Sequence, residues 1–212
     1  MGEPFTDMEI DALREIGNIG AGNASVKISE ILGQKVDMKV TDLTVIPLSS
    51  LAEPMKGNAE DMVVSIFLRV GGDVEGSNVL GSIVNMFQKD LALRLYDLMC
   101  EKPMGSTHFI DERSQEKFYL LGRETSQAYL NALCKLLGIR LIAEDPILTV
   151  NKRSIIMKFM MQNIPSYNKE DVLNIRTEFI IPNYGLKGEF VLLFGFESIS
   201  EFRAIINKML NQ

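Results

Sequence analysis

The first thirty residues repeat apolar and small side chains at steps of three and four, the period of a helix packed on one side. Thr6 and Glu9 have the spacing of a capping box and Gly33 is a natural stop, so the pattern predicts a helix ending at Leu32. Its predicted buried stripe consists of Ile10, Leu13, Gly17, Ala21, Ala24, Ile28 and Ile31. Another face carries Asp11, Glu15, Asn18, Gly22, Ser25 and Ser29.

The rest of the chain changes between strand-like and helical patterns in an order that occurs twice. The first half predicts strands over 35–48, 62–70 and 74–84, then a helix over 86–100. The second half predicts a helix over 111–137, a strand over 139–150, an ambiguous apolar run over 155–161, strands near 172–181 and 189–195, and a helix over 198–210.

The two halves match at particular residues. A shift of 105 positions carries Leu32-Gly33 onto Leu137-Gly138, and a shift of 112 carries Gly76 onto Gly188. Two repeats are too few for a solenoid, which needs at least three. We therefore expect a mixed α/β fold of the α+β class in a single domain over 1–212, with half-repeats over about 6–100 and 111–211.

Composition and charge limit the classes of partner. The 28 acidic residues outnumber the 22 basic ones, and a net charge of −6 argues against binding nucleic acid. No apolar run reaches the roughly 20 residues that span a bilayer, and the first twenty residues lack a signal-peptide pattern, so we expect a cytoplasmic chain with no membrane association. Cys100 and Cys134 are too few for a disulfide framework, and their leucine-rich surroundings predict buried thiols.

Two familiar kinds of site are absent from the sequence pattern. The single histidine, His108, has no cluster of ligand residues at metal-binding spacing, so we expect a surface or loop histidine and no metal site. Gly17, Gly20 and Gly22 do not have the order of a dinucleotide-binding loop, and no strand precedes them. A nucleotide site is therefore not predicted.

Three glycines inside one helix still require an explanation, because each costs about 1 kcal/mol relative to alanine. One interpretation is that another backbone packs closely against the helix. The other is that Gly22 and Ser25 leave a low, open platform beside Glu15 and Asn18, which a second protein would complete. The sequence pattern alone leaves both interpretations open.

The segment from Asp11 to Ser25, DALREIGNIGAGNAS, strongly resembles the signature helix of the CheC/CheX/FliY family of chemotaxis phosphatases. The family pattern is Asp or Ser, three residues, Glu, two residues, Asn, then 22 residues and Pro. Asp11, Glu15 and Asn18 match it. The resemblance continues through 72–76 and through Tyr129 to Leu133 in the second long helix, and so covers nearly the whole chain.

This resemblance implies a pseudo-twofold domain whose two long helices lie exposed against a largely antiparallel sheet. It also implies hydrolysis of the aspartyl phosphate of a CheY-type response regulator. Asn18 would orient the attacking water, and Glu15 would anchor the active-site lysine of the regulator. A carboxamide suits that role, because it both accepts and donates hydrogen bonds. The chain would need no cofactor of its own, because the phosphorylated partner would supply Mg²⁺.

The sequence departs from the family pattern at two places. Thr41 stands where the motif proline is expected, which predicts a looser strand entry beside the first site. In the second helix, Glu116, Leu120 and Arg123 stand at the Asp/Ser, Glu and Asn positions, and Pro146 follows after 22 residues. The second site would therefore keep its frame and lack its chemical groups.

A different class of function stays open beside the phosphatase. The chain would then be a non-enzymatic interaction module that binds a response regulator, the deamidase CheD or a flagellar switch protein, and Thr41 favours this alternative. The resemblance places CheD docking near 147–161, where Asn151, Lys152 and Arg153 supply polar groups.

Overall fold

The computed structural model describes residues 5–47, 50, 58–74, 77–163, 171–196 and 199–210. Its helices are α1 (Asp7–Leu32), α2 (Lys89–Met99), α3 (Glu112–Leu137), α4 (Arg153–Asn163) and α5 (Ile199–Leu210), with a short 3₁₀ turn η2 (Pro182–Tyr184). Its strands are β1 (Asp37–Pro47), β2 (Met62–Val74), β3 (Ser77–Gln88), β4 (Arg140–Ala143), β5 (Ile147–Lys152), β6 (Asp171–Ile181) and β7 (Leu186–Phe196).

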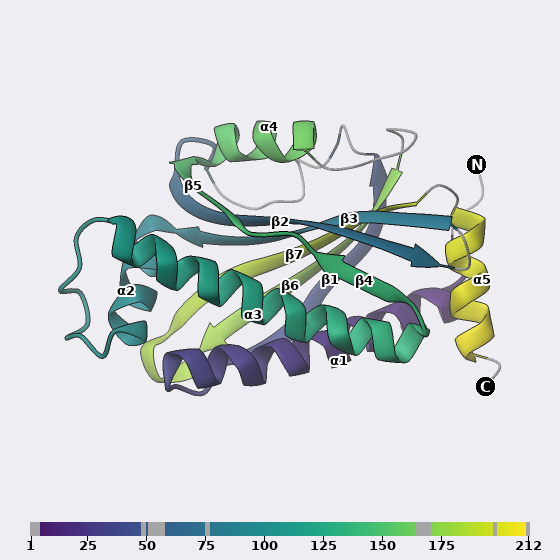
Figure 1. Cartoon of the computed structure of the whole chain (residues 1–212), viewed down its shortest axis with the longest axis horizontal. Coiled ribbons are helices and arrows are strands. Elements are labelled where there is room, and N and C mark those ends of the chain that lie inside the picture. Colours follow the sequence, from purple (N-terminus) through teal and green to yellow (C-terminus); the bar gives the residue numbers. More distant parts are fainter. Residues whose placement is uncertain are drawn as a thin grey trace.

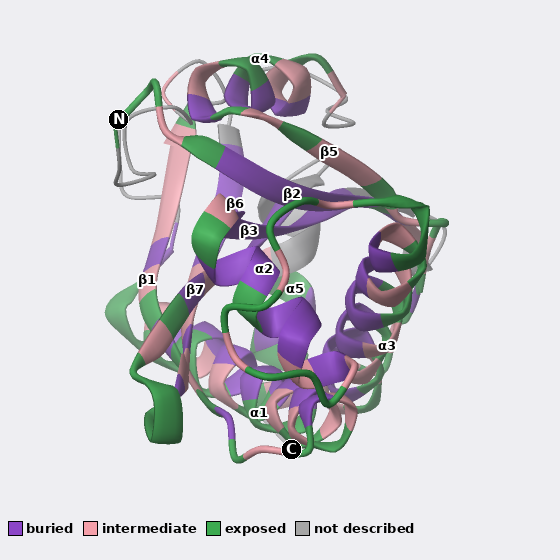
Figure 2. Ribbon diagram, turned by 90° about the vertical axis from the view of Figure 1, so that its left-hand side faces the viewer, coloured by how far each residue is buried: buried purple, intermediate pink, exposed green. Residues whose placement is uncertain are grey.

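The described strands form one curled antiparallel sheet in the order β1-β6-β7-β3-β2-β4, with β5 also paired to β2. The long helices α1 and α3 lie side by side on one face of this sheet (Figure 1). Helix α4 covers part of the opposite face, as the view along the sheet shows (Figure 2). The mixed α/β fold with long helices on a largely antiparallel sheet, expected from the sequence, is thus confirmed.

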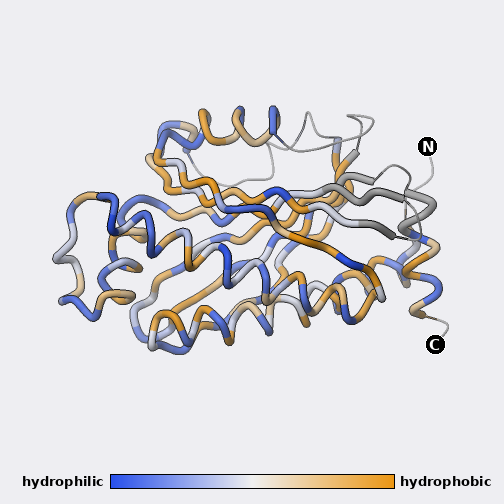
Figure 3. Tube along the Cα trace, in the orientation of Figure 1, coloured by the Kyte–Doolittle hydropathy of each residue, from blue (hydrophilic) through white to orange (hydrophobic). Residues whose placement is uncertain are grey.

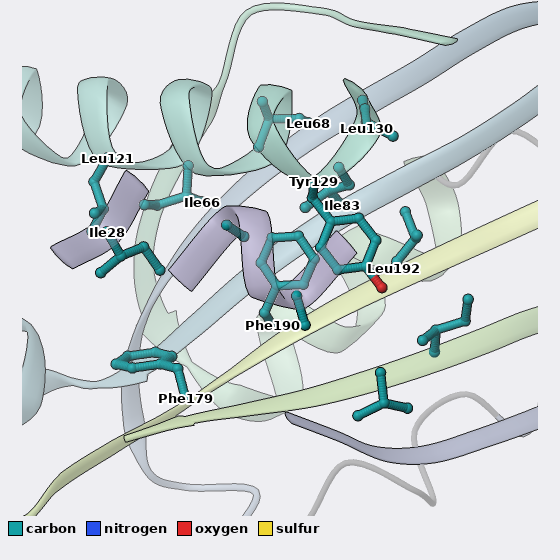
Figure 4. Close-up of a cluster of buried hydrophobic side chains, with 14 of the residues drawn as sticks. Ile28, Ile66, Leu68, Ile83, Leu121, Tyr129, Leu130, Phe179, Phe190 and Leu192 are labelled. Atoms are coloured by element: carbon teal, nitrogen blue, oxygen red, sulfur yellow. The ribbon is translucent and has the colours of Figure 1, made fainter. Parts of the chain in front are cut away.

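The larger hydrophobic core lies between the sheet and the helices α1 and α3. Tyr129 of α3 is fully buried at its centre and stacks on Phe190 of β7, with 5.0 Å between ring centroids (Figure 4). A smaller core lies under α4, where Ile156 and Met160 pack on β2, β3 and β7. Hydrophobic and hydrophilic positions accordingly alternate around α1 and α3 (Figure 3).

The ends of α1 and α3 follow the sequence prediction closely. Thr6 and Glu9 form the capping box of α1, and Gly33 ends the helix in the left-handed conformation at φ 62°. Asp111 caps α3, and Gly138 ends it at φ 67°. Both helices therefore begin and end at residues that are 105 positions apart.

Several predicted boundaries differ from the structure. The predicted strand over 139–150 is two strands, because the segment 144–146, which ends in Pro146, interrupts pairing between β4 and β5. The helix predicted from Met86 begins at Lys89, and the ambiguous run 155–161 lies inside α4. The predicted equivalence of Gly76 with Gly188 falls partly outside the described residues.

The predicted environments of three side chains have mixed outcomes. Cys100 and Cys134 are half-buried against the larger core, whereas the sequence predicted buried thiols. His108 is exposed in the loop between α2 and α3, as predicted. None of the helices in the described part of the chain has the length and apolar character needed to span a membrane.

Candidate functional site

Asp11, Glu15 and Asn18 lie on the outward face of α1, where the steps of four and three residues align them. Asp11 is exposed and forms a long surface ion pair with Arg14 at 3.4 Å, an interaction that contributes little to stability. Glu15 is exposed, and its carboxylate has no hydrogen-bond or ion-pair partner among the described residues. The charge of Glu15 is therefore available to a partner molecule.

Asn18 is half-buried and is held by the neighbouring strand. Its Oδ1 accepts a hydrogen bond of 3.1 Å from the backbone N–H of Val40 in β1. Because a backbone N–H only donates, this contact determines which end of the carboxamide faces β1. The Nδ2 donors and the second lone pair of Oδ1 stay available. Sequence reasoning had treated Asn18 as simply exposed and had no signal for this contact.

Thr41 lies directly beside Val40, at a β-bulge in the pairing of β1 with β6. Val40 pairs with Thr177 and Asp42 with Arg176, so Thr41 is the extra residue between them. The Thr41 hydroxyl donates a long hydrogen bond of 3.4 Å to the carbonyl of Arg176. Thr41 lies inside β1, within the strand predicted over 35–48 and four residues after its start at Asp37.

The glycines of α1 divide between the two interpretations of the sequence. A Cβ on Gly20 would lie 2.9 Å from the Tyr129 ring, and one on Gly17 would lie 3.1 Å from Val40 Cγ2. Close packing of α3 and β1 thus accounts for these two glycines. A Cβ on Gly22 would meet nothing within 4 Å, so packing within the described chain does not account for Gly22.

Part of the predicted platform around Gly22 is already occupied by contacts within the chain. The Ser25 hydroxyl donates to the Val36 carbonyl, and Ser29 Oγ accepts from the Val36 N–H at 2.9 Å, so both serines bind the chain entering β1. Two apolar side chains that sequence reasoning did not single out, Ile19 and Val26, are 37% and 63% exposed on α1. The site thus combines Glu15 and Asn18 with an exposed apolar rim.

The corresponding face of α3 is also turned outward. Glu116, Leu120 and Arg123 are exposed, and Pro146 is half-buried between β4 and β5. The scaffold therefore presents the predicted degenerate positions to solvent, with an apolar side chain in place of Glu and a cation in place of Asn.

The predicted CheD-docking segment, 147–161, comprises β5 and most of α4. The three polar residues named from the sequence have different environments: Asn151 is half-buried and its Oδ1 accepts from the Lys152 N–H at 2.8 Å. Lys152 is exposed and forms an ion pair of 2.6 Å with Glu60, whereas Arg153 is only 7% exposed. Arg153 is therefore not a surface group that a docking protein could contact directly.

The fold and the outward-facing segment of α1 are similar to those of CheC-like proteins. The model of the CheC-like family matches residues 8–40, which contain Asp11, Glu15, Asn18 and Val40. Thermotoga maritima FliY has the same fold, with a TM-score of 0.72 at 22% identity and coverage of 97% of this chain and 98% of that one. The FliM middle domain of Helicobacter pylori also matches, with a TM-score of 0.63 at 11% identity over 96% and 99% of the two chains.

Relatives with known activities match in sequence. The CheY-P phosphatase CheC of Bacillus subtilis is 31% identical over 144 residues, which are 65% of this chain and 64% of CheC. The flagellar motor switch phosphatase FliY of the same organism is 35% identical over 78 residues, which are 37% of this chain and 20% of FliY. This chain thus spans less than two thirds of the length of either relative. The resemblance to the CheC-like family is confirmed.

Proposed function

We propose that this chain hydrolyses the aspartyl phosphate of a CheY-type response regulator. The observation that carries the proposal is the pair formed by Glu15, exposed without a partner, and Asn18, oriented by Val40 on the same helix face. Both residues lie in the segment that the CheC-like family model matches, and a relative with 31% identity is a CheY-P phosphatase.

Asn18 would position the attacking water. The Val40 N–H occupies one lone pair of Oδ1, so the carboxamide has one acceptor site and the Nδ2 donors left for the water and a phosphoryl oxygen. The water oxygen forms a bond to phosphorus as the bond from phosphorus to the aspartyl oxygen breaks. The carboxylate leaves without needing a proton, and both protons of the water go to the phosphate, which is released as H₂PO₄⁻ and exchanges a proton with solvent according to the pH. Positioning is then the main contribution of the chain.

Glu15 would hold the regulator in place. Its free carboxylate lies one helical turn before Asn18, where it can pair with the active-site lysine of a docked regulator. Mg²⁺ and the phosphorylated aspartate would come from the regulator, so this chain needs to supply only Glu15 and the water-positioning amide. The exposed side chains of Ile19 and Val26 would add apolar contact beside these polar groups.

Phosphate release from a phosphorylated CheY-type regulator tests the proposal. The wild-type chain is expected to accelerate release, and Asn18→Ala is expected to abolish the acceleration. Glu15→Ala should chiefly weaken binding of the regulator. Asn23→Ala is the matched control, because Asn23 is an exposed carboxamide on α1 whose Nδ2 donates a hydrogen bond to the Ile19 carbonyl at 2.9 Å. Equal rates for the wild-type and Asn18→Ala chains would refute the proposed role of Asn18.

The loss in Asn18→Ala must be separated from unfolding. This substitution also lowers stability, because it removes the acceptor of the Val40 N–H, an interaction worth about 1 kcal/mol. Asn18→Asp keeps an acceptor oxygen for Val40 and loses the Nδ2 donors. An inactive but stably folded Asn18→Asp variant therefore separates catalysis from stability.

The second candidate function is binding of a partner without hydrolysis. The fold match to FliM middle domains favours it, since the H. pylori domain in complex with FliG matches this chain with a TM-score of 0.61 at 12% identity. Thr41 in place of the motif proline favours it too. A response regulator, CheD or a flagellar switch protein would be the partner. Saturable binding of a regulator with no increase in phosphate release would support this function over the phosphatase.

A further inference from the structure

A cavity of about 280 Å³ is lined by residues of β3, β6 and β7 and by Arg153 of α4, and its Met86 belongs to the smaller core under α4. Met86 of β3, Glu189 of β7 and Glu178 of β6 are direct cross-strand neighbours there, and Arg153 lies above them at the start of α4. Gln88, Lys187 and Gly188 complete the lining. The proposed phosphatase function uses none of these residues.

Among the residues that the structure describes, Arg153 is a buried cation without a counter-charge. The residue is 7% exposed, and within this described part its side chain donates from Nη1 to the thioether sulfur of Met86 at 3.3 Å. Nε has no partner, and no carboxylate of the described residues lies within ion-pair distance of the guanidinium. An arginine does not lose its proton in a protein, so this burial is unfavourable unless an anion compensates the charge.

The acidic residues of the cavity already have other partners. Glu189 Oε1 accepts from Arg176 Nη2 at 2.8 Å, and Glu178 pairs with Lys187 at 3.8 Å. These cations relieve the repulsion between two glutamates placed directly opposite each other. Glu189 Oε2, however, is buried and has no hydrogen-bond donor within the described segments. The cavity therefore presents an unpaired cation and an unpaired acceptor together.

We infer that this cavity binds a small oxyanion that also carries a hydrogen-bond donor, such as protonated inorganic phosphate. The anionic oxygens would accept from Arg153, and the exposed ammonium of Lys187 would stand at the rim. An O–H of the ligand would donate to Glu189 Oε2. A phosphate ion fits within the volume, which equals that of several water molecules.

Selectivity between phosphate and sulfate tests the inference. Both are tetrahedral oxyanions, but near neutral pH phosphate carries an O–H and sulfate does not. Bound sulfate has no O–H to donate, so it would leave Glu189 Oε2 unpaired beside an anion. The wild-type chain should therefore bind phosphate at least about tenfold more tightly than sulfate in calorimetric titrations. Arg153→Met should lose phosphate binding, since Met keeps the apolar stem without the charge.

Two further variants keep the test decisive if Arg153→Met fails to fold. Glu189→Gln replaces the carboxylate acceptor with an amide that can donate, so this variant should lose the preference and bind sulfate at least as well as phosphate. Asn18→Ala should leave phosphate binding unchanged, which separates this cavity from the site on α1. The inference is overturned if phosphate does not bind saturably, if both anions bind with equal affinity, or if the preference for phosphate survives Glu189→Gln. The cavity would then hold only water, or surface charge alone would account for any binding.

Discussion

Glu9 joins the N-terminus of α1 to α5, and its neutralisation is expected to destabilise the chain. Within the capping box, Glu9 Oε2 accepts from the Thr6 N–H at 2.7 Å. Its carboxylate also accepts from Arg203 Nε and Asn207 Nδ2, each at 3.0 Å, and is only 3% exposed. The Arg203 guanidinium is the main cause of the lowered pKa of Glu9, and burial opposes it, giving a pKa of about 2 against an ordinary 4.5.

The magnitude follows from that lowered pKa. A carboxyl group whose pKa falls from 4.5 to about 2 on folding stabilises the folded state by about 3 kcal/mol when charged. Glu9→Gln keeps the size and an acceptor oxygen but removes the charge, so we expect a loss of about 2–3 kcal/mol at pH 7. For a chain of this length, that loss lowers Tm by roughly 4–12 °C.

The stabilisation of the folded state by Glu9 depends on pH. The unfolded state, with the higher pKa, binds a proton first as the pH falls, so the stabilisation by Glu9 is complete above about pH 5 and lost between about pH 5 and pH 2. Urea denaturation followed by far-UV circular dichroism at pH 7, 4 and 3 measures it; the chain has no tryptophan for fluorescence. The difference between wild-type and Glu9→Gln chains should shrink at each lower pH.

A matched control is Glu116→Gln, which neutralises an exposed carboxylate on α3 and should change stability by less than about 0.5 kcal/mol. Equal stability of the Glu9→Gln and wild-type chains at pH 7 would refute the reasoning, as would a difference that stays constant down to pH 3.

Three further predictions concern residues of α1, β1 and α3. Gly22→Ala should raise stability by up to about 1 kcal/mol in thermal melts, because the added Cβ meets nothing, and should weaken regulator binding in a titration if a partner approaches that backbone closely. Thr41→Pro should fold, because a bulge in an edge strand tolerates proline, and should raise phosphate release; loss of the far-UV signal would show that the Thr41 N–H is needed. In an Asn18→Ala background, Leu120→Glu with Arg123→Asn should restore detectable phosphate release, and a folded but inactive triple variant would show that the second face has diverged in shape as well.

Local signals explain what the sequence predicted well. The capping box of Thr6 and Glu9 and the glycine stop at Gly33 depend on neighbouring residues, so α1 was predicted with its boundaries. The strand over 139–150 was predicted as one element, although Glu144, Asp145 and Pro146 interrupt its apolar pattern and β4 and β5 pair separately with β2 on either side of them. Pattern alone does not specify where pairing stops.

Contacts between residues far apart in the sequence had no local signal. The contact of Asn18 with Val40 joins residues 22 positions apart, and that of Glu9 with Arg203 joins residues 194 apart. The sequence likewise did not distinguish Gly20, required by the ring of Tyr129, from Gly22, which has no such neighbour. Such distinctions depend on which element packs against each helix face.

The most direct test of the account is the rate of phosphate release from a phosphorylated CheY-type regulator with wild-type, Asn18→Asp, Asn18→Ala and Asn23→Ala chains. Loss of a positioned water should slow the reaction by about a hundredfold or more in both Asn18 variants. The Asn23→Ala chain should keep the wild-type rate. Release that equals the regulator's own decay with the wild-type chain, or that is as fast with folded Asn18→Asp as with wild type, would contradict the account.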